Sequence, residues 1–235
     1  MNNVSEFIKL ANDNEGFISV IIFTMTLLLG WGSGIFESLR RRPRFKIRVL
    51  EGPTFCCSFP TGREYKGNKT HITGLALYLD VTNVGSAPSS IGRIEIGYHN
   101  YTFKNTFLWF WLKHQVVSLT DFHVQLGEFV KVYPFLTQHN QLSPHKSGRY
   151  LEVGRSTNGV VYFEQTESWG GFRPREKNGG IRIIIRVEDA FGGKHSLKTF
   201  VSRVSLQEAQ KYNPYFGESR ETAKLANTSE DYDVI

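Results

Sequence analysis

The sequence predicts an all-β soluble domain, an antiparallel β-sandwich of roughly eight or nine strands, preceded by a single transmembrane α-helix. Three observations favour this class. Residues 17–36 are apolar and uncharged, whereas apolar and polar residues alternate in short runs after residue 44. Aromatic residues make up 14% of the 235-residue chain, which also contains 22 glycines. That composition suits strands joined by tight turns.

Residues 17–36 are the predicted membrane anchor, with the sequence FISVIIFTMTLLLGWGSGIF. As a helix, this segment covers about 30 Å, the thickness of the hydrocarbon core. A buried helix of a soluble protein would show a polar face, and this one has none. A cleaved signal peptide is the alternative, but it needs basic residues before the apolar run. The segment before this run instead contains three acidic residues, Glu6, Asp13 and Glu15, and one basic residue, Lys9.

Charge around the anchor predicts its orientation. The basic run RRRPRFKIR, residues 40–48, follows the apolar segment. Because Lys and Arg stay on the cytoplasmic side, residues 1–16 are expected to form a short extracytoplasmic tail. The adjacent Cys56 and Cys57 are expected to pack in the core as free thiols, which suits a reducing compartment. We therefore predict a single-pass membrane protein with a cytoplasmic C-terminal domain.

The basic juxtamembrane linker, residues 37–48, can also contact lipid. Each positive side chain next to anionic headgroups gains about 1 kcal/mol. Orientation during insertion already explains these residues, so lipid recognition would be an additional role. The candidates are Arg40, Arg41, Arg42 and Arg44. Much of the net charge of +6 lies here, too close to the bilayer to wrap a duplex, so nucleic acid is not an expected partner.

Gly30 and Gly34 share one face of the predicted helix. This small-xxx-small spacing lets two helices approach closely, which makes the pair a candidate for helix association. The alternative is that glycine is simply common in transmembrane helices. The hydroxyl groups of the helix are expected to bond back to its own carbonyls; they belong to Ser19, Thr24, Thr26 and Ser33.

Residues 44–204 carry the strand pattern of the predicted sandwich. Alternation is clearest at residues 45–49, 75–82, 181–187 and 196–204. The last two runs flank a glycine-containing turn and predict a hairpin. The layout resembles immunoglobulin-like sandwiches in architecture alone. Residues 205–235 are expected to form short polar helices and an acidic tail.

The apolar run FLWFWL, from Phe107 to Leu112, has three interpretations. It could be a strand buried on both faces. It could be a loop whose rings lie at the level of the lipid headgroups. It could also be a patch that binds a partner. The side chains concerned are Phe107, Trp109, Phe110 and Trp111. In a strand, Trp109 and Trp111 would share one face and Phe110 would occupy the other.

No motif for catalysis, metal or cofactor binding stands out. The seven histidines form no His-x-His or His-Glu-x-x-His arrangement. Glycine pairs precede strands rather than helices, so no phosphate-binding loop is predicted. Asp189 lies in a predicted turn, where its carboxylate can accept hydrogen bonds from backbone amides. We therefore expect no enzyme, cofactor or metal site, although catalytic groups can also converge from distant positions.

The predicted function is that of a membrane-tethered, non-enzymatic binding or sensing module. Its expected partners are the lipid bilayer and a protein or further copies of the chain, and a small-molecule ligand is compatible with it. Two alternatives come from other classes: a membrane-perturbing effector and, less favoured, a membrane-bound hydrolase. One anchor joined to one compact cytoplasmic domain resembles the plan of some bacterial antiviral defence effectors, without a shared motif.

Overall fold

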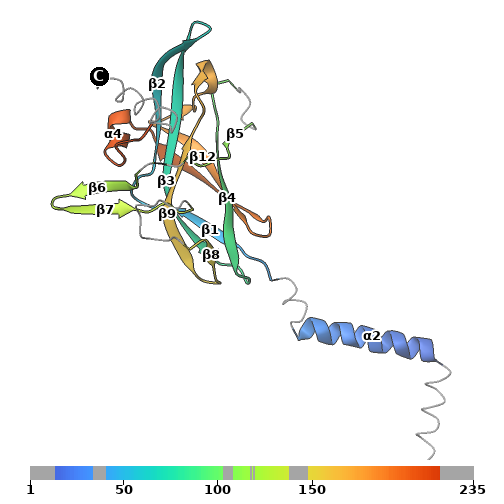
Figure 1. Cartoon of the computed structure of the whole chain (residues 1–235). Helices are drawn as coiled ribbons and strands as arrows, with labels where there is room; N and C mark the ends of the chain where they lie inside the picture. The colour runs from blue at the N-terminus through green and yellow to red at the C-terminus, as the bar shows by residue number, and fades with distance from the viewer. Residues whose placement is uncertain are drawn as a thin grey trace, which may run out of the picture. The chain divides into compact units, whose positions relative to one another are not determined.

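The computed structural model describes residues 14–33, 41–102, 108–116, 118, 120–137 and 148–217. The chain divides into two compact units, Met1–Arg42 and Pro43–Ile235. The first contains helix α2 and the second contains the strands and the short helix α4 (Figure 1).

Helix α2 spans Glu15–Gly32, and none of its residues is buried. Its length and apolar composition are sufficient to cross a membrane. Thr24, Thr26 and Ser33 donate to helix carbonyls three or four residues earlier, over 2.7, 2.8 and 3.1 Å. These bonds, which the sequence predicts, satisfy hydroxyl donors that lipid could not. Residues 34–36 of the predicted span lie outside the described part of the chain.

The described residues of the second unit contain thirteen strands, of which four are only two or three residues long. In chain order they are β1 (Phe45–Val49), β2 (Phe55–Tyr65), β3 (Asn68–Asn83), β4 (Ser89–Tyr98), β5 (Phe110–Leu112), β6 (Phe122–Leu126), β7 (Phe129–Tyr133), β8 (Tyr150–Leu151), β9 (Ser156–Glu164), β10 (Ser168–Trp169), β11 (Glu176–Lys177), β12 (Gly180–Asp189) and β13 (Lys194–Ser202). A single 3-10 turn, Gly170–Phe172, and helix α4, Leu206–Gln210, complete the elements.

The first sheet is built around β3. Strands β2 and β1 pair in succession along one edge of β3, and β9 and β10 pair along the other. The turn between β2 and β3 has Lys66 and Gly67 at positive φ, which is the conformation of a type I′ hairpin turn. All of these pairings are antiparallel.

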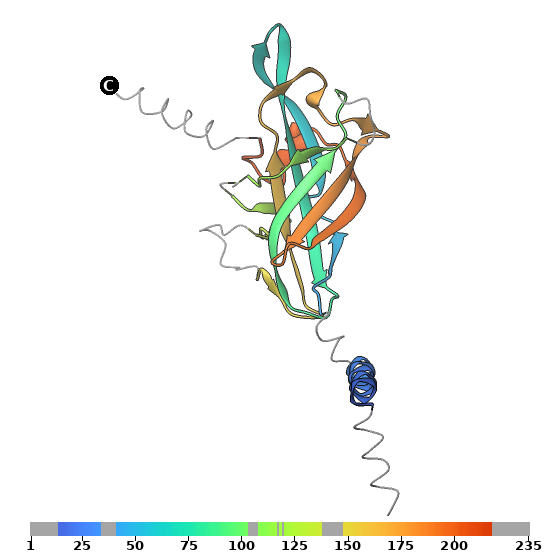
Figure 2. The ribbon, with the colours of Figure 1, turned by 90° about the vertical axis from the view of Figure 1, so that its right-hand side faces the viewer.

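The second sheet has β12 and β4 at its centre. Strand β13 pairs with the outer edge of β12, as the predicted hairpin requires. Strand β4 pairs with the other edge of β12, and β11 pairs at the start of that edge. Beyond β4 lie two short strands, β5 near its end and β8 near its beginning. Figure 2 looks onto this sheet, with β4 in green and β12 and β13 in orange.

The two sheets contribute their inner faces to one hydrophobic core. Alternate residues of β3, β4 and β12 supply most of it: Leu75, Leu77, Leu79, Val81, Ile94, Ile96, Ile183, Ile185 and Val187, all at most 1% exposed. The antiparallel, strand-rich class predicted from the sequence is therefore confirmed. The immunoglobulin-like character of the arrangement stays a prediction.

A second core covers the outer face of the first sheet. Ala76 and Tyr162 on that face pack with Phe122, Phe135 and Phe216, which come from segments outside both sheets. Helix α4 borders this core through its buried Ala209, and Ser205 and Glu208 form a capping box at its start. Strand β3 is consequently buried on both faces over much of its length, whereas alternation in the sequence suggests one buried face.

Both cysteines are buried in β2 as free thiols. Because neighbours in a strand point to opposite faces, Cys56 joins the first core and Cys57 the second. Burial raises the pKa of both thiols, that of Cys57 to about 11. Core packing, the role expected from the sequence, accounts for the pair.

Candidate docking surface

The predicted helix-association and lipid-binding residues lie at the start of the chain. Gly30 is in the last turns of α2, whereas Gly34 and Arg40 lie outside the described residues. The arginines that precede and begin the domain are exposed, namely Arg41, Arg42 and Arg44. Their lipid-binding role stays a prediction.

The aromatic run forms a shorter strand than its sequence suggests. Strand β5 contains only Phe110–Leu112 and pairs with β4, with Trp111 opposite Gly97. Trp109 precedes the strand, and Phe107 falls outside the described residues. Among the described strands β5 pairs with β4 alone, and its rings are half-buried rather than enclosed on both faces.

Each described ring of the run already has a partner within the domain. Trp109 stacks on His99 with ring centres 3.9 Å apart. Phe110 turns toward Tyr98 and the edge of the first core. Trp111 lies on the opposite face of β5, against the guanidinium of Arg186. The run therefore helps to hold the edge of the second sheet, and a docking role would have to use rings that are already engaged.

Strands β6 and β7 form a separate hairpin. They pair only with each other among the described strands, with Phe122 opposite Tyr133 and Leu126 opposite Phe129. Gly127 adopts φ +63°, which suits the first central position of a two-residue type II′ turn. The hairpin projects from the side of the domain (Figure 1).

The base of this hairpin is fixed to the second core. Phe122 and Tyr133 are 0% and 5% exposed, and Val124 packs against the same core. The backbone N–H of His123 donates to the carbonyl of Tyr212 over 2.7 Å, which links β6 to the segment after α4. The base is thus held by both packing and a backbone hydrogen bond.

The outer half of the hairpin exposes apolar side chains that the fold does not use. Four residues within seven positions are about half exposed or more: Leu126, Phe129, Val130 and Val132, with Phe129 at 78%. Lys131 bends back over the ring of Tyr133, with its ammonium 5.0 Å from the ring centre. Glu128 lies at the turn itself. We call these four apolar residues the hairpin patch.

The sequence predicts a strand at Phe129–Tyr133, which is β7 as the structure has it, but it does not predict the hairpin patch. The pattern FHVQLGEFVKVY signals two strands around a Gly-Glu turn. Apolar residues at neighbouring positions, Val130 and Val132 on one face and Phe129 on the other, indicate a strand with two apolar faces. Such a strand is normally buried, so only the three-dimensional arrangement reveals that no strand of the described segments covers it.

Asp189 and His195 form a structural pair of ionisable groups. The carboxylate of Asp189 accepts hydrogen bonds from the backbone amides of Phe191 and Gly193, over 2.8 and 3.0 Å. It also lies 2.9 Å from Nε2 of His195. Burial alone would raise the pKa of Asp189, but the hydrogen bonds from His195, Gly193 and Phe191 hold it below its usual value. Nδ1 of His195 accepts the amide of Phe45. Both ring nitrogens are engaged, so the pair ties β1 to the β12–β13 turn and offers no base to a substrate.

No group of three His, Cys, Asp or Glu residues with metal-binding geometry occurs in the part of the chain that the structure describes.

No protein-family model and no curated protein matches the chain. Its structure is similar to the crystal structure of a provisionally named ApaA protein from Bordetella pertussis, with 7% sequence identity and a TM-score of 0.27. The alignment covers 69% of this chain and 96% of that one.

Proposed function

We propose that this chain is a membrane-anchored, non-enzymatic binding module that docks a protein partner through the β6–β7 hairpin. The observation that carries the proposal is the hairpin patch: four exposed apolar side chains on a rigidly based hairpin without a strand neighbour in the described structure. Exposed apolar side chains of this kind mark protein or membrane interaction sites. Leu126 and Phe129 supply one face of the hairpin, and Val130 and Val132 supply the other.

Energetics favour a protein as the occupant of the patch. Burying one Val, Leu or Phe side chain contributes about 1.5–3 kcal/mol, and folding leaves this contribution unused at the patch. Among the described strands β7 pairs only with β6, so its other edge is open to an extended segment of a partner, which can add as a further strand. Backbone pairing would give such a complex affinity, and the alternating side chains would give it specificity.

The helix supplies the membrane anchor in this proposal. Helix α2 has the length and composition of a span, and exposed arginines follow it. The positive-inside rule then places the domain, which we take to be an immunoglobulin-like sandwich, in the cytoplasm. Anchoring confines the hairpin to the bilayer surface and raises its effective concentration toward partners that are themselves membrane-bound. No specific observation among the described residues favours either of the alternative functions, the membrane-perturbing effector or the hydrolase.

Site-specific photo-crosslinking tests the proposal. A photoreactive amino acid replaces Phe129 in the full-length chain in its native membranes, and the control replaces Phe191. Phe191 is 75% exposed on the β12–β13 turn and matches Phe129 in size and exposure. We expect a discrete protein adduct from position 129 and none from position 191. Adducts to lipid only, or the same adducts from both positions, would contradict docking of a protein.

A further inference from the structure

A hollow of about 470 Å³ opens beside β4. None of the residues that line it belongs to the hairpin patch. It arises because the second edge of β4 is paired only near its two ends. Strand β8 pairs with Ser89 and Ser90, and β5 pairs with residues 96–98. Between them, residues 92–95 have no strand partner on that side in the described structure, although β12 pairs with Ile94 and Glu95 along the other edge.

The opposite wall of the hollow is a segment that connects the two sheets. After β5, residues 113–115 leave the second sheet, and the amide of Val116 donates to the carbonyl of Tyr162 in β9 of the first. Thr137 follows a segment that also runs beside β9, where the amide of Leu136 donates to Val160. The hollow therefore lies on the side of the domain where this crossing chain bridges the sheet edges.

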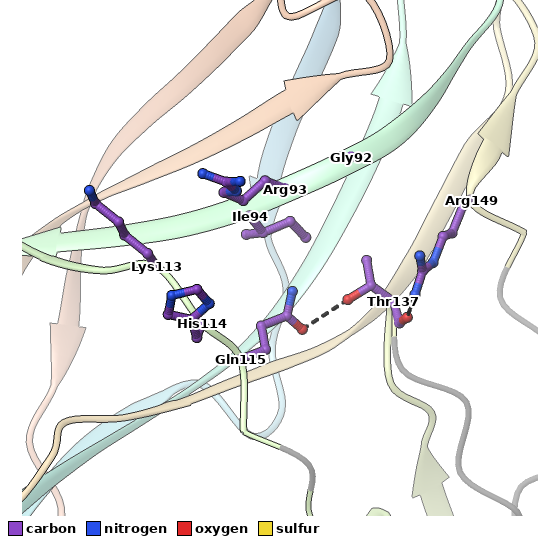
Figure 3. A pocket seen from close by; sticks show the side chains of 8 residues that line it. All are labelled: Gly92, Arg93, Ile94, Lys113, His114, Gln115, Thr137 and Arg149. Atoms are coloured by element: carbon purple, nitrogen blue, oxygen red, sulfur yellow. Dashed lines mark hydrogen bonds between the residues drawn. The ribbon is translucent and has the colours of Figure 1, made fainter.

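The side chains around the hollow are donors and cations. Arg93, Lys113, His114, Gln115, Thr137 and Arg149 supply them, and no carboxylate is among its lining residues (Figure 3). Three of these side chains carry a full positive charge at neutral pH. A space of this volume is within the range of small-molecule sites, which is about 300–1,000 Å³.

Hydrogen bonds hold part of this lining in place. The hydroxyl of Thr137 donates to Oε1 of Gln115 over 2.8 Å, so the amide nitrogen of Gln115 turns toward β4 (Figure 3). The guanidinium of Arg149 donates to the carbonyl of Thr137. Gln115 thus keeps its two N–H donors for another acceptor.

The charge in the hollow is only partly balanced. Arg93 approaches Glu95 at 3.9 Å, but the carboxylate of Glu95 is closer to Arg186, at 3.2 Å. Lys113 and His114 are exposed and have no ion-pair or hydrogen-bond partner within the described segments. Unbalanced cations beside amide donors make a site for an anion with several acceptor oxygens.

We infer that this hollow binds the phosphate group of a small molecule or of a lipid headgroup. Arginine forks recognise phosphate oxygens in pairs, and a lysine adds a mobile point charge. The unpaired backbone of residues 92–95 adds further polar groups along one wall. This site is independent of partner docking at the hairpin patch, with which it shares no lining residue.

Binding of inorganic pyrophosphate to the full-length chain in detergent micelles tests the site by isothermal titration calorimetry. A parallel arm repeats the titration with short-chain phosphatidic acid and, as its control, with short-chain phosphatidylcholine. Lys113→Gln is the site variant, because Lys113 has no described partner whose loss would disturb folding. Lys194→Gln, at an exposed lysine of β13, is the matched control.

We expect Lys113→Gln to weaken binding about tenfold and Lys194→Gln to leave it unchanged. Pyrophosphate binding that depends on Lys113 identifies a soluble phosphate ligand. Dependence on Lys113 only with short-chain phosphatidic acid identifies a lipid headgroup. Absence of binding in both arms, or equal losses for the two variants, would overturn the inference, since equal losses show only a general effect of surface charge.

Discussion

The ring of Trp111 lies on the outer face of the second sheet with its centre 3.9 Å from the guanidinium carbon of Arg186. It also covers Gly97, whose absent side chain leaves room for the ring: a Cβ there would come within 3.2 Å of Trp111 and 2.9 Å of Ile184. A ring over a sheet glycine replaces the contacts that the missing side chain would have made.

Trp111→Ala is therefore expected to destabilise the domain by about 1–3 kcal/mol, less than the about 3–5 kcal/mol of a core tryptophan. Gly97→Ala should also destabilise it, because the new methyl group meets the ring. Removal of the ring should relieve part of that clash, so the two effects should be coupled by about 0.5–1 kcal/mol. Urea denaturation of both single variants and the double variant measures the coupling. Strictly additive effects would show that the ring does not rest on Gly97.

Asp189→Asn is expected to destabilise the protein by about 1–3 kcal/mol at neutral pH, because the buried carboxylate binds His195 and two amides. The pKa of Asp189 is lower in the folded state than its ordinary value of 3.8. The corresponding stability is complete above pH 3.8 and is lost as the pH falls below it. The difference in the free energy of unfolding between wild type and Asp189→Asn should therefore become smaller as the pH falls below 3.8. Denaturation midpoints at several pH values measure this, with Glu188→Gln as a control. If the difference in stability between wild type and Asp189→Asn does not change with pH, the ionised carboxylate of Asp189 is not the source of the stabilisation.

Neither cysteine should react with iodoacetamide in the folded protein at pH 8. Burial raises the pKa of Cys57 to about 11, from an ordinary value of 9.0, so the reactive thiolate is scarce. The unfolded thiol ionises first, and stability should fall as the pH rises from about 9 toward 11. Cys57→Ala should reduce that dependence. Mass spectrometry of the alkylated native protein gives the first readout, and rapid modification without denaturant would be incompatible with the buried position.

Membrane topology follows from the charge asymmetry around α2. A reporter fused to the C-terminus is expected to report the cytoplasm, and one fused near residue 2 the opposite side. Replacing Arg41 and Arg42 with Gln should weaken this preference, because fewer positive charges would hold the C-terminal flank inside. A C-terminal fusion that reports the extracytoplasmic side would show that the proposed orientation is wrong.

Local pattern was enough to predict several of the regular strands but not all of them, since β2 at Phe55–Tyr65 was not predicted. The alternation at residues 181–187 and the glycines at 192 and 193 led to the β12–β13 hairpin, which the structure shows with β12 at Gly180–Asp189. The hydroxyl-to-carbonyl bonds of α2 were also foreseeable, since they involve residues three or four apart.

Features that depend on distant segments could not be predicted in this way. The second core forms because Phe122, Phe135 and Phe216 reach the outer face of β3, and no local period encodes that meeting. The basic hollow exists because β5 and β8 are short and leave the middle of the β4 edge uncovered. The exposure of Phe129 likewise depends on the tertiary arrangement, in which β7 pairs only with β6 among the described strands.

The central claim, that the hairpin patch binds a protein, is tested most directly by separating stability from binding. Phe129→Ser and Val132→Ser are introduced together in the full-length chain and compared with Phe191→Ser. We expect all these proteins to melt within a few degrees of wild type, because the three replaced side chains are exposed. Recovery of the adduct partner, identified by crosslinking at position 129, is then measured from native membranes by quantitative mass spectrometry. The account predicts that the hairpin double variant loses at least about nine-tenths of the partner while Phe191→Ser retains it. Full retention of the partner by a stable double variant would contradict it.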